Sequence, residues 1–228
     1  MPVQINPTLW WLFDANCPSY AEVVNGLRPT SVSGTLDFQD ASLFLDNPIT
    51  PNQTATSWLT YDAPATQFTS LNGFTISFWF SLGVQNMVAY SSMVSFISDD
   101  VPFANYFDIL SDRLGGAGGF YGQNGPGASP WTNSTSDFGF TPAIVPGAWN
   151  HIAVTMVDGG FAGYSNGELT ASWTYGREVT VAGFVFGRTG QGIFPNDHPF
   201  NGALKDVRMY DSPLDDGDVA QVFSEFVA

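Results

Sequence analysis

Cysteine, histidine and basic residues are scarce in this chain. Its 228 residues include one Cys, two His and six Lys plus Arg, against 21 Asp plus Glu. The single cysteine, Cys17, excludes an internal disulfide, and so few Cys and His residues argue against a zinc site. A net charge of −15 opposes binding to nucleic acids and anionic membranes, because these are themselves negative. We therefore expect neither a nucleic-acid partner nor membrane insertion.

Long apolar runs and a recognisable export signal are also missing. The N-terminal segment MPVQINPTLWWLFDA has no basic region, and its apolar run is only five residues long, which is not typical of a secretory signal. The uncharged stretch from Ala63 to Ser98 contains Ser, Thr, Asn, Gln and Gly throughout. Its composition favours two strands and a loop over a membrane helix. These features predict a protein that is made in the cytoplasm.

Glycine, proline and aromatic residues, in contrast, are abundant. The chain has 24 Gly, 15 Pro, 20 Phe and 7 Trp; aromatic residues favour strands, while Gly and Pro punctuate turns. The clearest predicted strand runs from Phe74 to Leu82. Phe, Ile and Leu occupy one of its faces and Thr, Ser and Trp the other, which is the period of two that a strand requires.

Further short segments have the same character. Strands are predicted at 9–14, 34–38, 42–46, 57–62, 92–98, 106–110, around 120–121, 146–155, 179–187 and 203–210. Residues 215–226 are the helix candidate, with Asp215 and Asp216 near its start, where the helix dipole favours negative charge. Together these patterns predict an all-β fold: a single domain, residues 1–228, built as a two-sheet antiparallel β-sandwich with one short C-terminal helix.

Three segments carry a family resemblance. The stretch from Phe200 to Phe223 reads FNGALKDVRMYDSPLDDGDVAQVF, residues 146–155 read PGAWNHIAVT, and residues 164–169 read YSNGEL with an Asn-Gly hairpin signal. They resemble the laminin-G-like domains of the concanavalin A-like lectin/glucanase superfamily. The resemblance implies a concanavalin A-like jelly roll. It leaves the function open, because lectins, enzymes and purely structural modules share this fold.

The closing strand within that stretch has an alternating pattern. Its pattern predicts one face formed by Ala203, Lys205, Val207 and Met209, and an opposite face formed by Leu204, Asp206, Arg208 and Tyr210.

A hydrolytic site is not predicted. Glycoside hydrolysis needs two carboxyl groups about 5–10 Å apart, and the glucanases of this superfamily place them on one strand as Glu-x-Asp-x-(x)-Glu. This chain has glutamates only at Glu22, Glu168, Glu178 and Glu225. None has a second carboxylate two or four residues away on an inner strand, so we expect a non-enzymatic protein.

Nucleophilic catalysis is not indicated either. Cys17 precedes a proline in a loop-like stretch and is interpreted as an inert thiol. His151 lies in the Trp-x-His strand segment and is interpreted as a core or sheet-face histidine held by a hydrogen bond.

A ligand site is predicted in the glycine-rich, aromatic segment from Leu114 to Ser136. Aromatic side chains next to amides suit sugar binding, and Tyr121, Trp131 and Asn133 have this combination. Two alternatives stay open: the same side chains could fill the core, or they could form a protein-binding patch, because Trp and Tyr are also enriched at protein interfaces.

Calcium is the metal that the family resemblance implies. Many laminin-G-like domains bind Ca²⁺ at the sandwich rim through oxygen ligands. The candidates here are two loop pairs, Asp99 with Asp100 and Asn196 with Asp197. The alternative is that these residues are simply solvated loop side chains.

Two functional hypotheses follow. In the first, the chain is a non-enzymatic, lectin-like virion structural protein: a bacteriophage capsid decoration or tail-appendage subunit used for docking or adhesion. It would be made in the host cytoplasm, and its partners would be viral structural proteins or further copies of itself in a homo-oligomer. In the second, it is a Ca²⁺-dependent carbohydrate-binding lectin module outside a virion, cytoplasmic or exported without the Sec route, with a surface glycan as its ligand.

Overall fold

The structure is a computed structural model of the chain. It describes residues 5–13, 20–48, 54–64, 68–69, 71–83, 91–98, 106–111, 118–123, 147–157, 160–174, 180–188 and 199–226.

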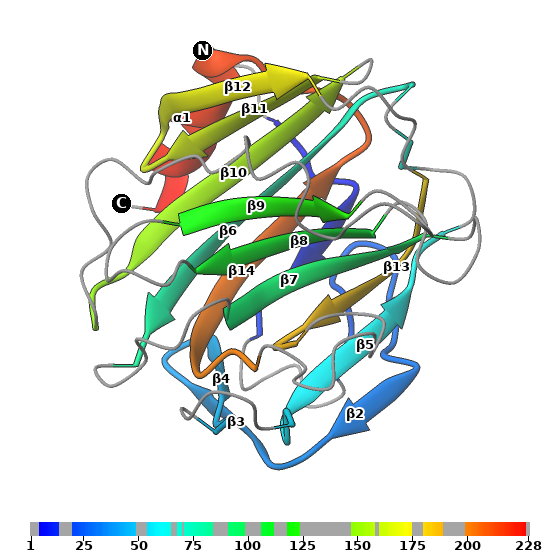
Figure 1. The fold of residues 1–228 in the computed structure, drawn as a ribbon, viewed down its shortest axis with the longest axis vertical. Helices are drawn as coiled ribbons and strands as arrows, with labels where there is room; N and C mark the ends of the chain where they lie inside the picture. Colours follow the sequence, from blue (N-terminus) through cyan, green and yellow to red (C-terminus); the bar gives the residue numbers. More distant parts are fainter. Residues whose placement is uncertain are drawn as a thin grey trace.

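The described strands form two antiparallel sheets that face each other (Figure 1). The larger sheet has the order β12 (Glu168–Thr174), β11 (Gly160–Ser165), β10 (Asn150–Val157), β6 (Phe74–Leu82), β14 (Gly202–Tyr210), β4 (Ser42–Leu45) and β3 (Leu36–Gln39), and β1 (Leu9–Trp11) also pairs with β14. The smaller sheet has the order β2 (Ser31–Ser33), β5 (Trp58–Asp62), β13 (Val181–Phe186), β7 (Ser91–Ser98), β8 (Tyr106–Ser111) and β9 (Gly118–Gln123). The predicted all-β sandwich with a C-terminal helix is confirmed.

The core lies between the two sheets and is strongly aromatic. Phe74, Phe78 and Phe80 on β6 point into it and are almost fully buried. From β1, the Trp11 ring meets aromatic rings of the smaller sheet edge-on, including Phe184 and Phe186 at centroid distances of 5.6 and 5.3 Å. Edge-to-face contacts of this kind add to the free energy gained by burying the rings. The apolar face predicted for Phe74 to Leu82 is therefore the core face.

Helix α1 (Asp216–Phe226) lies on the outer face of the larger sheet. Asp215 caps it, since its carboxylate accepts a hydrogen bond from the Asp218 backbone N–H at 2.9 Å. Val219 and Val222 then pack in a second, smaller apolar cluster with Tyr164 of β11 and other outer-face residues. In the part of the chain that the structure describes, no helix is long and apolar enough to cross a membrane.

A β-bulge in β14 overturns the alternation predicted for this strand. Lys205 pairs with Trp79 and Arg208 with Ser77, so Asp206 and Val207 together oppose a single residue of β6. Asp206 has a positive φ of 50°, a conformation that Asp tolerates better than most residues. Leu204 therefore shares the core with Val207, whereas Lys205 shares the outer face with Arg208. The prediction failed because a strict period of two cannot register one extra residue.

Candidate functional site

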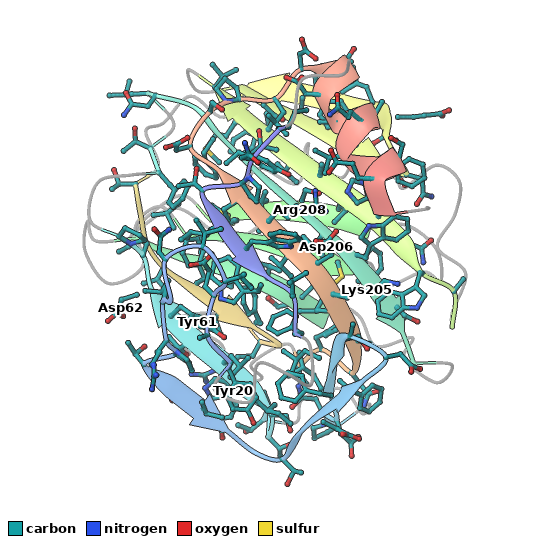
Figure 2. The ribbon with its side chains drawn as sticks, turned by 180° about the vertical axis from the view of Figure 1, so that it is seen from behind. Tyr20, Tyr61, Asp62, Lys205, Asp206 and Arg208 are labelled. Carbon is teal, nitrogen blue, oxygen red and sulfur yellow. The ribbon has the colours of Figure 1, made fainter. Side chains whose placement is uncertain are left out.

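The outer face of the larger sheet brings together aromatic and charged side chains from β1, β6, β10, β14 and α1. They fall into two neighbouring groups, one of which includes the bulge residue Asp206. We call Asp206, Arg208 and Glu225 the ionic cluster, and Trp79, Trp149 and Lys205 the aromatic platform. Figure 2 views the molecule from this side, and its labels show Lys205, Asp206 and Arg208 following one another along β14.

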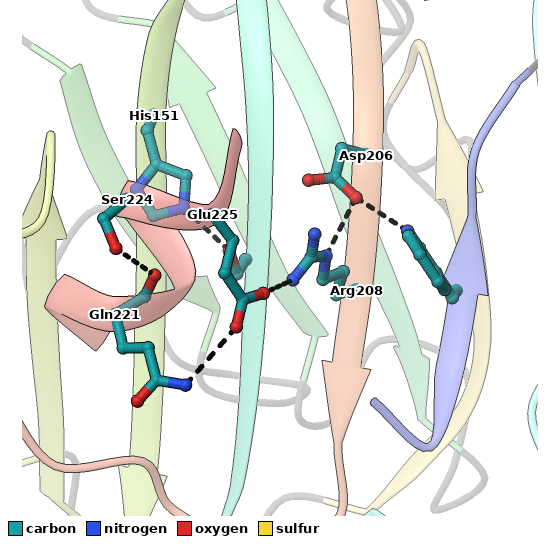
Figure 3. Close-up of polar contacts among 8 residues, drawn as sticks. His151, Asp206, Arg208, Gln221, Ser224 and Glu225 are labelled. Carbon is teal, nitrogen blue, oxygen red and sulfur yellow. Dashed lines mark hydrogen bonds and ion pairs between the residues drawn. The ribbon is translucent and has the colours of Figure 1, made fainter. Parts of the chain in front are cut away.

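The ionic cluster fastens α1 to the sheet (Figure 3). Arg208 donates from Nε to Asp206 Oδ1 at 2.8 Å and from Nη1 to Glu225 Oε2 at 2.7 Å. The indole Nε1 of Trp10 donates to the same Asp206 oxygen at 2.6 Å. Burial alone would lower the pKa of Arg208, but its hydrogen bonds and the charge of Asp206 raise that pKa above its ordinary value. Both carboxylates are thus paired with one guanidinium. This arrangement is typical of a structural ion pair rather than of an acid–base site.

His151 is buried between the sheet and α1. Its Nε2 lies 2.7 Å from Ser77 Oγ, and its ring lies 5.3 Å from the Trp79 ring and 5.5 Å from the Phe223 ring. Burial and, to a smaller extent, the charge of Arg208 lower the pKa of His151 to about 3. The imidazole is therefore neutral near pH 7, and its interpretation as a hydrogen-bonded sheet-face histidine is confirmed.

The aromatic platform holds a lysine against two tryptophan rings. Lys205 Nζ lies 3.9 Å from the centre of the Trp149 ring and 5.7 Å from that of Trp79, both within cation–π range. Trp79 is only 7% exposed, because its ring also stacks on Phe223 of α1 at 5.4 Å. Trp149 and Lys205, however, remain partly exposed. Burial lowers the pKa of Lys205, and the charge of Asp206 offsets part of this effect.

The outer face of the larger sheet extends past the aromatic platform, on the side away from the ionic cluster and α1. Ala203 pairs with Ser81 of β6 on one side and with Phe44 of β4 on the other. Ser81 and Phe44 are partly exposed. Trp149, Lys205 and these neighbours therefore form a solvent-accessible surface that combines aromatic rings, a hydroxyl group and one ammonium group. Such a surface can stack on the C–H face of a sugar ring while polar groups bind its substituents.

The described glutamates lie in three different environments. Glu22 is buried, and its carboxylate accepts hydrogen bonds from the backbone N–H groups of Trp10, Val24 and Asn25 at 2.6 to 2.7 Å. Glu225 belongs to the ionic cluster, and Glu168 is exposed beside a hairpin turn. Among the described residues, no group of three or more His, Cys, Asp or Glu side chains could hold a metal ion.

Family comparison agrees with the architecture. A laminin-G family model, described as the concanavalin A-like lectin/glucanases superfamily, matches residues 53–220. This chain belongs to that superfamily. The resemblance drawn from the sequence is therefore confirmed. No curated protein sequence matches the chain significantly.

Solved structures with the concanavalin A-like fold come from several sources. Domain 4 of AbnA, a GH43 extracellular arabinanase from Geobacillus stearothermophilus in complex with arabinotriose, superposes with a TM-score of 0.69 at 19% identity, over 95% of this chain and 97% of that one. The CBM40 of the Ruminococcus gnavus IT-sialidase, bound to α2,3-sialyllactose, gives 0.51 at 19%, over 67% and 83%. The binding domain of botulinum neurotoxin serotype D gives 0.58 at 16%, over 96% and 51%. At these identities the likeness establishes the fold alone.

Of the site residues predicted from the sequence, only Tyr121 belongs to the described part of the chain. Tyr121 lies in β9, at one edge of the smaller sheet, which also confirms the short strand expected there. The other predicted residues fall outside the described part of the chain: Trp131, Asn133, Asp99, Asp100, Asn196 and Asp197. Both the sugar site and the calcium site predicted there remain predictions.

The aromatic platform of this concanavalin A-like domain is not among the sites predicted from the sequence, for two reasons. Trp149 belongs to a segment that matches the family, so it was assigned to the strand alone. The alternating pattern groups Lys205 with Val207 and Met209, whereas the bulge separates them: those two residues lie in the core and Lys205 on the outer face. The one available signal was Trp79, a large apolar residue on the polar face of β6, and it indicates that this outer face is not simply solvated.

Proposed function

We propose that this concanavalin A-like domain is a non-catalytic, lectin-like module that binds a glycan on the aromatic platform. The observation that carries the proposal is the partly exposed Trp149 ring beside the Lys205 ammonium, 3.9 Å away. A partly exposed indole ring with an ammonium group over one of its faces brings together the two kinds of group that sugar recognition uses, an aromatic ring and a hydrogen-bond donor.

The comparisons support this proposal. The arabinanase domain was solved with arabinotriose, and the sialidase module with sialyllactose. Two proteins with this fold, from different bacteria, thus hold sugars. The state of the carboxylates supports a non-catalytic role: Asp206 and Glu225 are bound to Arg208, and Glu22 is bound to the backbone.

A glycan array, probed with the purified domain, tests the proposal. We expect binding to a restricted set of sugars, and a loss of about tenfold or more in affinity for them in Trp149→Ala, as is common when a central interface tryptophan is truncated. Trp58→Ala is the matched control, because Trp58 is a partly exposed ring on the smaller sheet that also contacts a cation, Arg188, at 4.1 Å. Equal losses in both variants, or no binding by the wild type, would contradict the proposal.

The calcium site is a separate part of the proposal. We infer that Asp99, Asp100, Asn196 and Asp197 supply oxygen ligands for Ca²⁺. A specific ion stabilises the folded state by mass action, so the melting temperature should rise with millimolar Ca²⁺ and fall again with a chelator. An unchanged melting temperature would remove calcium from the account, and Asp99→Asn with Asp197→Asn should abolish any shift that is seen.

We further propose that the module works on a bacteriophage particle, as a capsid decoration or tail-appendage subunit. Its partners there would be viral structural proteins or its own copies, and glycan binding would let it serve as an adhesion module. A compact sandwich with a strongly negative charge of −15 suits a soluble subunit that is displayed on a particle. Mass spectrometry of purified particles tests this role: the chain should be present in stoichiometric amounts, and its absence would leave only the free lectin module.

A further inference from the structure

We infer that the module binds an extended, neutral oligosaccharide chain, which crosses the outer face of the larger sheet from the Trp149 ring to the Phe44 ring. The inference rests on the proposed glycan-binding function and adds to it a second stacking position and a minimum length of the ligand. It comes from the strand register, which places the two rings on one row across the sheet with small side chains between them.

The register of the larger sheet defines this row. Ala203 of β14 pairs with Ser81 of β6 on one side and with Phe44 of β4 on the other. Trp149 directly precedes β10, and continuing the register of β10 with β6 by one residue places it next to Ser81. The strands β10, β6, β14 and β4 lie side by side in this order (Figure 1). The row therefore runs from Trp149 through Ser81 and Ala203 to Phe44, across the strands.

The side chains of this row project from the outer face. Side chains alternate between the two faces along a strand, and the neighbours of Phe44, Ser81 and Ala203 along their strands lie in the core. These core neighbours are Leu43, Leu45, Phe80, Leu82 and Leu204. Trp149 shares the outer face, because its ring contacts the Lys205 ammonium there. Trp149, Ser81 and Phe44 are all partly exposed.

The spacing of the two rings suits a chain of sugars rather than a single sugar. Adjacent strands lie about 4.8 Å apart, so the three strand spacings from Trp149 to Phe44 amount to about 14 Å. One sugar unit of an extended chain covers a length similar to one strand spacing, so roughly three units would join the two rings. Ser81 and Ala203 are small, and neither side chain stands up between the rings. A chain can therefore stack on both rings at once.

Charge favours a neutral chain. The four side chains of the row are uncharged, and a protein of net charge −15 repels polyanionic chains. Two residues along the strands from Ala203 and Phe44, Asn201 donates from Nδ2 to Asp46 Oδ1 at 3.2 Å. Asp46 is exposed, and a carboxylate can accept several hydrogen bonds. Sugar hydroxyl groups are suitable donors to it, whereas an acidic group on the sugar would repel it.

A series of chain lengths tests the inference. Titration calorimetry would measure the affinity of the wild type for linear α-1,5-arabino-oligosaccharides and β-1,4-gluco-oligosaccharides, from the monosaccharide to the hexasaccharide. In at least one series we expect the tetrasaccharide to bind about fivefold more tightly than the disaccharide or better, because only the longer chain reaches both rings. Further units should add little, because they extend beyond the row.

Substitutions assign this gain to the second ring. Phe44→Ala should lower the affinity for the tetrasaccharide to nearly that for the disaccharide and leave the disaccharide unaffected, whereas Phe44→Tyr keeps a ring and should retain the gain. Leu169→Ala is the control, because it truncates another exposed apolar side chain of the same sheet, on the edge strand β12. It should change neither affinity.

A measurement on the wild type covers the case in which Phe44→Ala is too unstable to compare. The ring resonances of Phe44 should shift in NMR spectra when the tetrasaccharide is added and remain unchanged with the disaccharide. Melting temperatures of the variants close to that of the wild type establish that a change in affinity does not arise from unfolding.

The outcomes separate this inference from the proposed function. If the tetrasaccharide binds no more tightly than the disaccharide, or if the gain survives in Phe44→Ala, the inference is wrong while the lectin-like function stands. The same holds if neither series binds but the glycan array identifies other sugars. If neither series binds and the array is silent, both are wrong.

Discussion

Arg208 donates a hydrogen bond from Nε to Asp206 Oδ1 at 2.8 Å, across the bulge that Asp206 itself introduces into β14. This contact links three features of the domain. It neutralises a buried arginine, it holds the strand in its bulged register, and it thereby keeps Lys205 on the outer face beside Trp149. The stability of the sandwich and the geometry of the proposed site therefore depend on the same pair.

The first prediction concerns this pair. Asp206→Asn should destabilise the domain by about 3 kcal/mol, the lower end of the range for breaking a buried ion pair, because Glu225 still compensates part of the Arg208 charge. Asn tolerates the positive φ at this position, so the backbone itself should remain unstrained. Urea unfolding measures the change. Asp211→Asn, at an exposed position, is the control, and a loss for Asp206→Asn no larger than that of the control would contradict the structural role of the pair.

The second prediction concerns Glu22. Glu22→Gln replaces one of the two carboxylate oxygens by an NH₂ group, which cannot accept a hydrogen bond. Either the Asn25 N–H, which Oε2 accepts, or the N–H groups of Trp10 and Val24, which Oε1 accepts, then lose their acceptor. An unpaired donor costs about 1–3 kcal/mol when it is buried, and these donors are only partly buried. The free energy of unfolding should therefore fall by about 1 kcal/mol, the lower end of that range. Glu168→Gln, which alters an exposed side chain, should change it by less than about 0.5 kcal/mol. Similar values for both variants would show that the Glu22 carboxylate does not hold its loop.

The third prediction concerns pH. The pKa of His151 is about 3 in the folded protein because burial, followed by the Arg208 charge, disfavours the imidazolium; its ordinary value is 6.5. The unfolded chain therefore binds one more proton than the folded chain between these two values. The stability contributed by neutral His151 is present above about pH 6.5 and is lost progressively as the pH falls toward 3.

Comparison with His151→Gln isolates this contribution from that of the many carboxylates. Over the same pH interval, the free energy of unfolding of the wild type should fall more steeply than that of the variant, by up to about 1.4 kcal/mol per pH unit. Urea unfolding at a series of pH values measures both slopes. Parallel curves for the two proteins would mean that His151 titrates normally in the folded state, and that it is not buried beneath α1.

Local patterns in the sequence predicted much of the fold. The alternation in β6 placed its core face correctly because the strand has no bulge and both of its neighbours are antiparallel. The Asn166-Gly167 hairpin was predicted because both residues need positive φ, and they have values of 50° and 82°. β2 was missed, since Ser31–Ser33 is a short, largely exposed strand with no apolar alternation to detect.

The candidate site was much less predictable. The aromatic platform joins Trp79 of β6, Lys205 of β14 and Trp149, which directly precedes β10. Their proximity follows from strand order and register, which a single sequence does not display. Lys205 in particular depends on a one-residue bulge, and Asp206 carries no signal for it beyond its tolerance of positive φ. The contact of Phe223 with Trp79 and His151 likewise depends on how α1 docks across the sheet.

The most direct test of the account follows the indole N–H resonances of the seven tryptophans by NMR, while a glycan that binds on the array is titrated into the protein. Each resonance can be assigned by single Trp→Phe substitutions. We predict that the Trp149 and Trp79 resonances shift in a saturable way, while those of Trp11 in the core and Trp58 on the smaller sheet do not. A saturable shift of Trp131 with no change at Trp149 would contradict the platform and would locate the sugar instead at Tyr121, Trp131 and Asn133.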